Sequence, residues 1–252
     1  MLRFTRLFLK GKLMPRFFID SPAGEVIRVT GSDAAHIGYS LRMRPGEKIT
    51  FCHSGIDYNC VIESITEKEV TCRVENTSPA LSEPTVRLTL YQAYPKQDKL
   101  ETIIQKTTEL GAARIVPFIS SRCVAKPDEK SYEKKLSRFR KIAEEAAKQS
   151  GRGIIPEVAP LMNFDQALED MKKNDTCLFC YENGGEKLKT AALSKSGSIG
   201  VMIGSEGGFE RSEADKAAAA GAVRIWLGER ILRCETCPIA VTAIIMNLTD
   251  NM

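Results

Sequence analysis

The stretch from Ile199 to Leu227, IGVMIGSEGGFERSEADKAAAAGAVRIWL, decides the fold of the larger part of this chain. It begins with a short apolar run, residues 199–203, and ends with another, residues 223–227. Between them lie a glycine-rich loop and an alanine-rich segment, residues 210–221, whose composition favours a helix. Continuously apolar strands are expected in a parallel sheet that is covered on both faces. The stretch therefore predicts a strand–helix–strand unit of an α/β domain.

The same alternation extends toward the N-terminus as far as Pro84. Further strands are predicted at residues 86–90, 115–118 and 177–181, and helices at residues 98–110, 131–150, 163–172 and 236–248. Asp98 with Glu101, and Asn163 with Gln166, have the spacing of a capping box, and Gly111 and Gly151 supply helix stops. Residues 84–252 are thus predicted to form a doubly wound parallel sheet that binds its ligand at the carboxyl ends of the strands.

Residues 14–83 have a different pattern, with short β-like runs separated by turn residues. The clearest runs are residues 16–19, 25–29, 48–51 and 70–74. They predict a small β-barrel or sandwich domain, followed by a linker over residues 77–84. Residues 1–13 are basic, contain no acidic residue and are not expected to be part of the fold. They could be a targeting segment or a basic arm, but a start upstream of the natural Met14 is the favoured interpretation.

Composition narrows the class of protein. Of the 252 residues, 43% are hydrophobic and 27% charged, and no apolar run reaches the roughly 20 residues of a membrane span. The eight cysteines, without a secretory signal, indicate reduced thiols in a soluble, cytoplasmic protein. Cys177 and Cys180 lie in a predicted strand and point to opposite faces, so no metal site is expected. Because His36 and His53 both lie in the N-terminal domain, a histidine-dependent hydrolase is disfavoured.

Two loops that run from a strand into a helix are candidate sites. In the first, residues 203–209, three glycines allow a ligand to approach the backbone closely, although a tight turn without a ligand is the alternative. This loop contains no lysine, and Glu206 would repel a phosphate. The second, residues 227–236, contains Arg230, Arg233 and Glu235, and its alternative is a charged surface loop. We predict Thr236 as the N-cap of the final helix.

Two further patterns concern partners. The net charge of +4 is compatible with a polyanion, and basic residues recur in both predicted domains and along the helix at residues 131–150. They indicate either solvated surfaces or a footprint for an RNA backbone. The final helix is apolar almost all round, which favours a two-fold homodimer interface over a fully internal position.

Six segments, taken together and in order, resemble the bacterial 16S ribosomal RNA (uracil-N3)-methyltransferases of the SPOUT superfamily. The segments are Met14-Pro15-Arg16-Phe17-Phe18, residues 41–46 (LRMRPG), residues 105–111 (QKTTELG), Glu145 through residues 149–152 (QSGR), residues 203–208 (IGSEGG) and residues 227–236 (LGERILRCET). The family usually has Pro at Ser205, Thr at Cys234 and Ala at Cys237. These departures are small-for-small replacements, so we expect the pocket to persist.

The resemblance implies a PUA-like N-terminal domain, a C-terminal domain with a deep trefoil knot, a homodimer, and S-adenosylmethionine bound in loops after the strands at Cys177, Ile199 and Val223. The cofactor-binding residues that it implies are Cys180, Tyr181, Ile203, Gly204, Ser205, Glu206, Gly207, Gly208, Leu227, Gly228, Ile231, Leu232, Cys234 and Thr236. The RNA-binding residues that we predict are Arg16, Arg42, Arg44, Lys106, Arg122, Gln149 and Arg152.

The implied reaction transfers a methyl group to N3 of a uridine in the 16S ribosomal RNA of the small subunit, and the target base must be unpaired or flipped out. Arg230 or Arg233 would stabilise the developing uracil anion, and Glu235 or water would take the proton. Two other functions stay open: a catalytically silent RNA-binding assembly factor that uses the basic residues, and an enzyme for a free nucleotide that uses the glycine loop.

Overall fold

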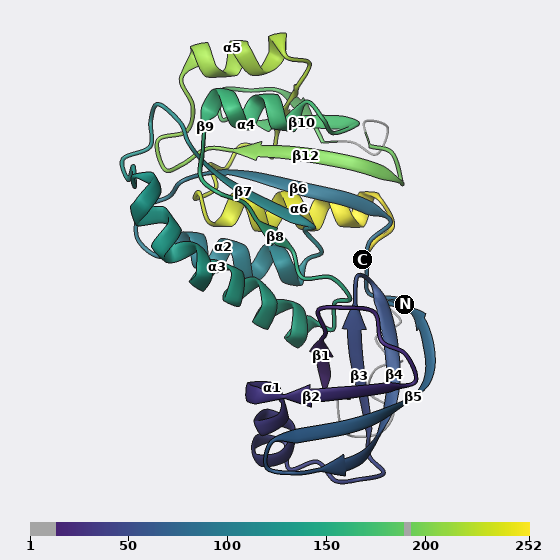
Figure 1. The fold of residues 1–252 in the computed structure, drawn as a ribbon. Helices are drawn as coiled ribbons and strands as arrows, with labels where there is room; N and C mark the ends of the chain where they lie inside the picture. The colour runs from purple at the N-terminus through teal and green to yellow at the C-terminus, as the bar shows by residue number, and fades with distance from the viewer. Residues whose placement is uncertain (1–13, 189–192) are drawn as a thin grey trace. The chain divides into compact units, whose positions relative to one another are not determined.

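The computed structural model describes residues 14–188 and 193–252. The chain divides into two compact units, Met1–Ser82 and Glu83–Met252, each with a hydrophobic core of its own (Figure 1). The extension predicted over residues 1–13 lies outside the described residues.

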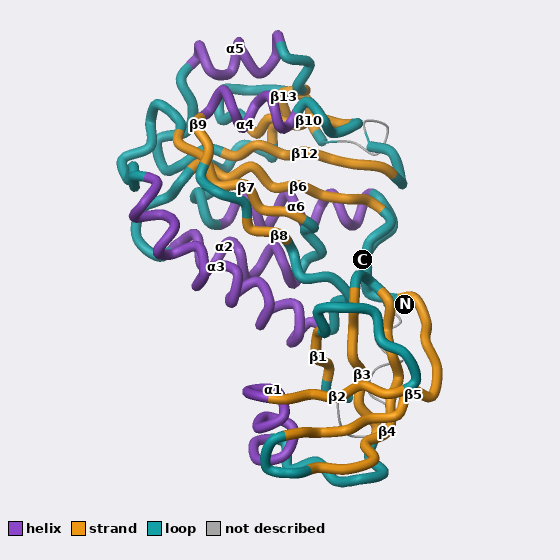
Figure 2. The backbone as a smooth tube through the Cα atoms, viewed as in Figure 1, coloured by secondary structure: helices purple, strands orange, loops and turns teal. Residues whose placement is uncertain are grey.

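Unit 1 is built on one curled sheet of five strands in the order β1-β3-β4-β5-β2. The strands are β1 (Arg16–Phe18), β2 (Val26–Thr30), β3 (Lys48–His53), β4 (Ile56–Ile65) and β5 (Glu69–Pro79). β1 and β3 pair in parallel, and the other strand pairs described from residue 14 onward are antiparallel. Two short helical segments, α1 (Gly31–Ala35) and η1 (His36–Ser40), interrupt the strands (Figure 2). Ile49, Phe51 and Ile62 are fully buried in the core of this unit.

Two features of unit 1 differ from the prediction. The ten residues of β4 were not among the predicted strands. The segment Thr77-Ser78-Pro79 was predicted to belong to a linker, but it is the end of β5 and pairs with Tyr58, Asp57 and Ile56. Proline and serine are local signals for a turn, whereas strand pairing is decided by a partner segment about 20 residues away. The linker prediction was wrong for these three residues.

Unit 2 contains a parallel sheet in the order β11-β13-β10-β12-β6-β7-β8, and β9 pairs with β7 at one side. The bounds are β6 (Val86–Ala93), β7 (Arg114–Ile119), β8 (Glu157–Val158), β9 (Met162–Asn163), β10 (Thr176–Cys180), β11 (Glu186–Lys187), β12 (Gly197–Ile203) and β13 (Val223–Trp226). All pairs are parallel, which confirms the predicted sheet.

Among the described residues, the helices that cover this sheet are α2 (Lys99–Glu109), α3 (Glu129–Ser150), α4 (Phe164–Met171), α5 (Arg211–Ala219) and α6 (Thr236–Leu248). Figure 1 shows α2, α3 and α6 on one side of β6 and β12, and α4 and α5 on the other. The strands are therefore covered on both faces, as their apolar sequences require. Leu88, Leu90 and Val201 are fully buried in this core.

The helix ends test the capping predictions. Gly151 ends α3 with a φ of 74°, and Asn163 with Gln166 forms the predicted capping box of α4. The capping box at Asp98 is wrong, because the Asp98 side chain caps nothing and Glu101 instead accepts from Arg138 at 2.7 Å. Thr236 is the first residue of α6 and not its N-cap, which is Glu235.

The strand order explains where a site can form. Because β10 lies between β12 and β13, the loops that follow these three strands meet at one edge of the sheet. These are the loops predicted to bind the cofactor. The trefoil knot stays a prediction.

Candidate cofactor and RNA site

A cavity of about 670 Å³ lies at the carboxyl ends of β10, β12 and β13. The predicted site residues that line it are Cys180, Tyr181, Ile203, Gly204, Ser205, Glu206, Gly207, Gly208, Leu227, Gly228, Arg230, Ile231, Leu232, Arg233 and Cys234. Neither Thr236 nor Glu235 belongs to this lining. The prediction missed the lining residues Lys99, Glu182, Ile225, Trp226, Glu229 and Cys237.

The glycine loop, which we define as residues 203–209, has its backbone packed closely against other parts of unit 2. Ser205 and Gly208 form a bridge, in which the Gly208 amide donates to the Ser205 carbonyl at 3.0 Å. Gly208 has a φ of 65°, and a Cβ atom there would lie 2.1 Å from Glu182 Oε1. A Cβ atom on Gly204 would lie 3.0 Å from the Gly208 Cα. The left-handed backbone at Gly208 therefore favours glycine, and a larger residue there would displace the Glu182 carboxylate.

Phe209 anchors the end of this loop. Its ring is 1% exposed and packs 4.4 Å from the ring of Phe179, measured between centroids. It also stacks on Phe118 at 6.3 Å. At the outer side of the loop, Arg122 Nε donates to Glu210 at 2.8 Å and Arg122 Nη1 donates to the Gly207 carbonyl at 3.2 Å. The loop is held in place by these contacts before any ligand arrives.

Lys99, in the first turn of α2, reaches both loops of the site. Its Nζ atom lies 2.9 Å from Glu206 Oε1 and 3.3 Å from Glu235 Oε2, and it also contacts Cys234 Sγ at 3.7 Å. The Lys96 amide donates to Glu206 Oε1 at 3.1 Å. The three charged side chains are each about one quarter exposed, at 24–26%.

These contacts fix the charges of the cluster. Burial is the largest single effect and raises the pKa of Glu206, but hydrogen bonds from Lys99, from the Glu206 and Lys96 amides and from Cys234 together outweigh it and lower that pKa to about 2. The pKa of Glu235 is also lowered, against the effect of burial, by hydrogen bonds from Cys234 and Lys99. Burial and the neighbouring Glu235 raise the pKa of the Cys234 thiol to about 12. At neutral pH both carboxylates are ionised and the thiol is protonated.

The arginine loop, which we define as residues 227–235, is far more open to solvent. Ile231 is 88% exposed, and Arg230 and Arg233 are exposed on either side of it. At the end of the loop, Cys234 is buried and its thiol contacts Glu235 Oε2 at 3.2 Å. The loop thus places two unburied guanidinium groups at the rim of the cavity.

Cys177 and Cys180, the two thiols predicted to point to opposite faces of a strand, have different partners. Cys177 donates to the Met171 carbonyl at 3.1 Å, whereas Cys180 contacts Cys237, a contact that raises the pKa of Cys180. Within residues 14–188 and 193–252, no group of three or more His, Cys, Asp or Glu side chains could hold a metal ion. No helix in the same ranges is long and apolar enough to span a membrane.

Two residues predicted to bind RNA are engaged inside their own unit. Arg152 is 2% exposed, pairs with Glu83 at 2.7 Å and also donates to the carbonyls of Thr108 and Ala112. Arg16 donates to both oxygens of Asp57, at 2.6 and 2.7 Å. Arg152 therefore stabilises unit 2 and is not presented to RNA, which corrects that prediction. Arg16 mainly ties β1 to β4.

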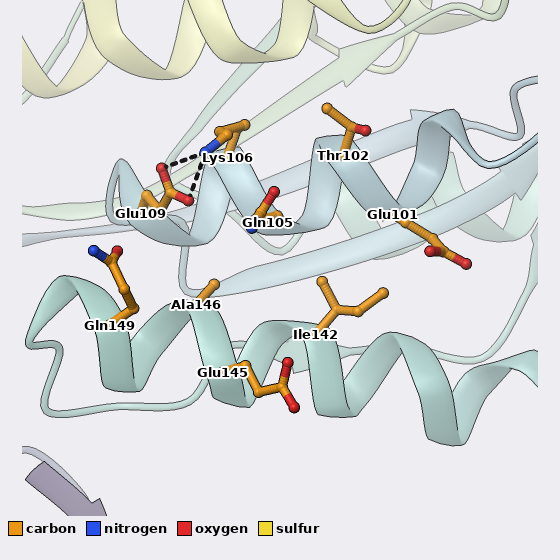
Figure 3. A pocket seen from close by; sticks show the side chains of 9 residues that line it. All are labelled: Glu101, Thr102, Gln105, Lys106, Glu109, Ile142, Glu145, Ala146 and Gln149. Atoms are coloured by element: carbon orange, nitrogen blue, oxygen red, sulfur yellow. Dashed lines mark hydrogen bonds and ion pairs between the residues drawn. The ribbon is translucent and has the colours of Figure 1, made fainter. Parts of the chain in front are cut away.

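Lys106 and Gln149 lie in a second cavity, of about 660 Å³, between α2 and α3. Figure 3 shows Ile142, Ala146 and Gln149 of α3 pointing toward α2. Lys106 Nζ is paired with Glu109 at 2.8 Å. This groove has an apolar floor formed by Ile142 and Ala146, and its sides carry the amides of Gln105 and Gln149 and the carboxylates of Glu101, Glu109 and Glu145. Arg42 and Arg44, in unit 1, are exposed.

The groups that line the first cavity, at the carboxyl ends of β10, β12 and β13, fit the predicted cofactor. Backbone groups of the glycine loop face it, and Ile225, Leu227 and Leu232 supply apolar surface for a base. The carboxylates of Glu182 and Glu206 suit a positively charged ligand and would repel a phosphate. The lining thus combines apolar surface for a base with carboxylates for a cationic group, beside the cations Lys99, Arg230 and Arg233.

Comparisons with known proteins agree with this interpretation. Residues 82–246 match the RNA methyltransferase domain family, and residues 29–75 match the RNA methyltransferase PUA domain. Ribosomal RNA small subunit methyltransferase E of Bacillus subtilis (strain 168) is 34% identical over 94% of this chain and 98% of its own length. The crystal structure of ribosomal RNA small subunit methyltransferase E from Neisseria gonorrhoeae bound to S-adenosyl methionine is 30% identical, with a TM-score of 0.84, over 94% of this chain and 98% of that one.

A second solved structure, the putative methyltransferase Lpg2936 from Legionella pneumophila with bound SAM, is 27% identical over 94% of this chain and 98% of that one. Its TM-score is 0.81. These matches cover both units and confirm the predicted fold class, a PUA-like domain followed by a SPOUT-type α/β domain. The chain belongs to the RNA methyltransferase family that includes ribosomal RNA small subunit methyltransferase E.

Proposed function

We propose that this protein uses S-adenosylmethionine to methylate N3 of a uridine in the 16S ribosomal RNA of the small ribosomal subunit. One observation carries the proposal: a preformed glycine loop and an exposed arginine loop share one cavity at the carboxyl edge of the sheet. The glycine loop suits a small ligand, and the arginine loop suits a polyanion. The names of the relatives support both the cofactor and the ribosomal RNA substrate.

The chain's own residues would bind and orient the cofactor. Apolar side chains such as Leu227 and Leu232 would hold its base, and the backbone of the glycine loop would hydrogen-bond to it. Glu206, with its low pKa, stays ionised and favours the positive charge. When bound, S-adenosylmethionine supplies an electrophilic methyl group. Alignment of that group with the target base would provide much of the acceleration.

The arginine loop would handle the base. Loss of the N3 proton places negative charge on the uracil ring, and Arg230 or Arg233 would stabilise it through hydrogen bonds. Glu235 is held ionised by its neighbours, and its lowered pKa makes it a weak proton acceptor. We therefore assign it to orienting a water molecule or an arginine, with water taking the proton.

Other residues would hold the RNA. Arg42 and Arg44 are exposed in unit 1, and Arg122 lies beside the glycine loop with its side chain 41% exposed. In the groove of Figure 3, Gln149 could hydrogen-bond to a base edge above the apolar floor. Lys106 would contact a phosphate after exchanging its pairing with Glu109.

The final helix would form the centre of a two-fold dimer. On α6, Ile244 is 37% exposed, and Ile239, Ala240, Ala243 and Leu248 are only partly buried. An apolar face of this kind on an otherwise packed helix is favourable to cover with a second copy. We also infer that the protein acts in the cytoplasm, where small subunits are assembled.

The test is methyl transfer from radiolabelled S-adenosylmethionine to three substrates: small subunits, naked 16S ribosomal RNA and free uridine nucleotides. We expect label in small subunits, recovered as 3-methyluridine after digestion. Binding of RNA without any transfer would indicate an assembly factor, and transfer to free nucleotides would indicate a nucleotide-modifying enzyme. Either result would overturn the proposal.

A further inference from the structure

We propose that Lys99 is a positioning residue that ties the glycine loop to the arginine loop around the cofactor. This inference rests on the proposed cofactor site. It goes beyond that site because Lys99 belongs to neither loop and comes from α2, more than 100 residues earlier in the chain.

The geometry gives the first argument. Lys99 Nζ lies within 3.3 Å of a carboxylate from each loop, Glu206 and Glu235. A single ammonium group thus donates to two segments that are joined to different strands, β12 and β13. Since an ammonium group has three donors, it can hold both carboxylates at the same time and still contact the Cys234 thiol.

The charges give the second argument. Because both carboxylates lie within 3.3 Å of the same nitrogen atom, they are close enough to repel each other when Lys99 is absent. The other groups with printed contacts to them are the Cys234 thiol, with a pKa of about 12, and the Lys96 backbone amide, while Arg230 and Arg233 of the same cavity are exposed to solvent. On the far side of the glycine loop, Arg122 is already paired with Glu210. None of these can replace the ammonium charge of Lys99 in holding Glu206 and Glu235 together.

Partial burial gives the third argument. All three side chains are about one quarter exposed, so their interaction is screened less than that of a surface ion pair. The hydrogen bond to Glu206 raises the pKa of Lys99 above its ordinary value, which keeps it charged throughout the physiological range. Lys99 can therefore link the two loops throughout that range.

The experiment measures binding of S-adenosylmethionine by calorimetry to wild-type protein, Lys99→Met, Lys99→Arg and a control, Lys216→Met. Lys216 forms an ion pair of similar length, 3.0 Å to Asp165, on the surface and outside the cavity. We expect Lys99→Met to raise Kd by about tenfold or more at about pH 8. Lys99→Arg should recover most of the affinity because it keeps a cation, and Lys216→Met should match wild type.

A pH series separates positioning from a loss of stability. In Lys99→Met, protonation of one carboxylate would relieve the repulsion, so the ratio of its Kd to that of wild type should shrink between about pH 8 and about pH 5.5. The ratio cancels the titration of the ligand itself. A Kd within about twofold of wild type, or a ratio that does not change with pH, would overturn the inference. Failure of wild-type protein to bind the cofactor would instead overturn the proposed function.

Discussion

The two loops at the site differ in how firmly the fold holds them. The glycine loop is fixed by an internal bridge, by the Arg122 contacts and by the buried Phe209 ring. The arginine loop is held at its two ends, by Leu227 against the core and by the contacts of Cys234 and Glu235, and it places Arg230, Ile231 and Arg233 in solvent between them. A small ligand benefits from a site formed in advance, because little conformational entropy is lost on binding. A large RNA can supply the contacts that order the second loop.

The largest expected difference is in stability. Replacing the buried Phe209 by alanine should lower the free energy of unfolding by about 3–5 kcal/mol, through lost burial and the cavity left behind. Replacing Ile231, which is 88% exposed, by alanine should change it by less than about 0.5 kcal/mol. Urea unfolding followed by circular dichroism measures both. Equal costs at the two positions would show that the arginine loop is packed as firmly as the glycine loop.

A substitution within the glycine loop should affect the cofactor directly. Gly208→Ala places a Cβ atom against the Glu182 carboxylate at a φ of 65°, so the Glu182 side chain, which lines the cavity, must move and the loop backbone is strained. We expect the affinity for S-adenosylmethionine to fall by about tenfold. Gly221→Ala is the matched control, because Gly221 has a φ of 88° but nothing lies within 4 Å of its added Cβ atom. If both variants bound the cofactor like wild type, the close approach at Gly208 would have no functional meaning.

A smaller effect is expected from acid. The pKa of Glu206 falls from an ordinary value of 4.5 to about 2 in the folded protein. Its contribution to stability is thus complete above about pH 4.5 and is lost as the pH falls toward 2. Unfolding measured between these limits should show a weaker loss in Glu206→Gln than in wild type. Parallel curves for the two proteins would contradict the pairing with Lys99.

Local signals in the sequence were enough to predict much of the fold. Gly151 and the Asn163–Gln166 pair act within a few residues, so the ends of α3 and α4 were predicted correctly. The Asp98 cap failed because Arg138, 37 residues away, takes the Glu101 carboxylate. The apolar strands of the parallel sheet were predictable because burial on both faces leaves a continuous pattern.

The residues of the site that lie on loops after strands could be predicted from the sequence. Sequence pattern and family resemblance together indicated most of the lining, but not Lys99, whose partner Glu206 is 107 residues away. Glu182 follows β10 directly, and the same rule about strand ends could have indicated it. Arg152 was misassigned because its partner, Glu83, lies 69 residues earlier and buries it. Long-range pairings of this kind leave no local signal.

The most direct test of the division between the loops is Arg233→Ala, measured for both cofactor binding and methyl transfer. Arg211→Ala, an exposed arginine on α5, is the control. We predict that Arg233→Ala keeps its Kd for S-adenosylmethionine within about threefold while single-turnover transfer to small subunits falls by about 100-fold or more. Transfer at the wild-type rate, or a loss of binding as large as the loss of transfer, would contradict the account.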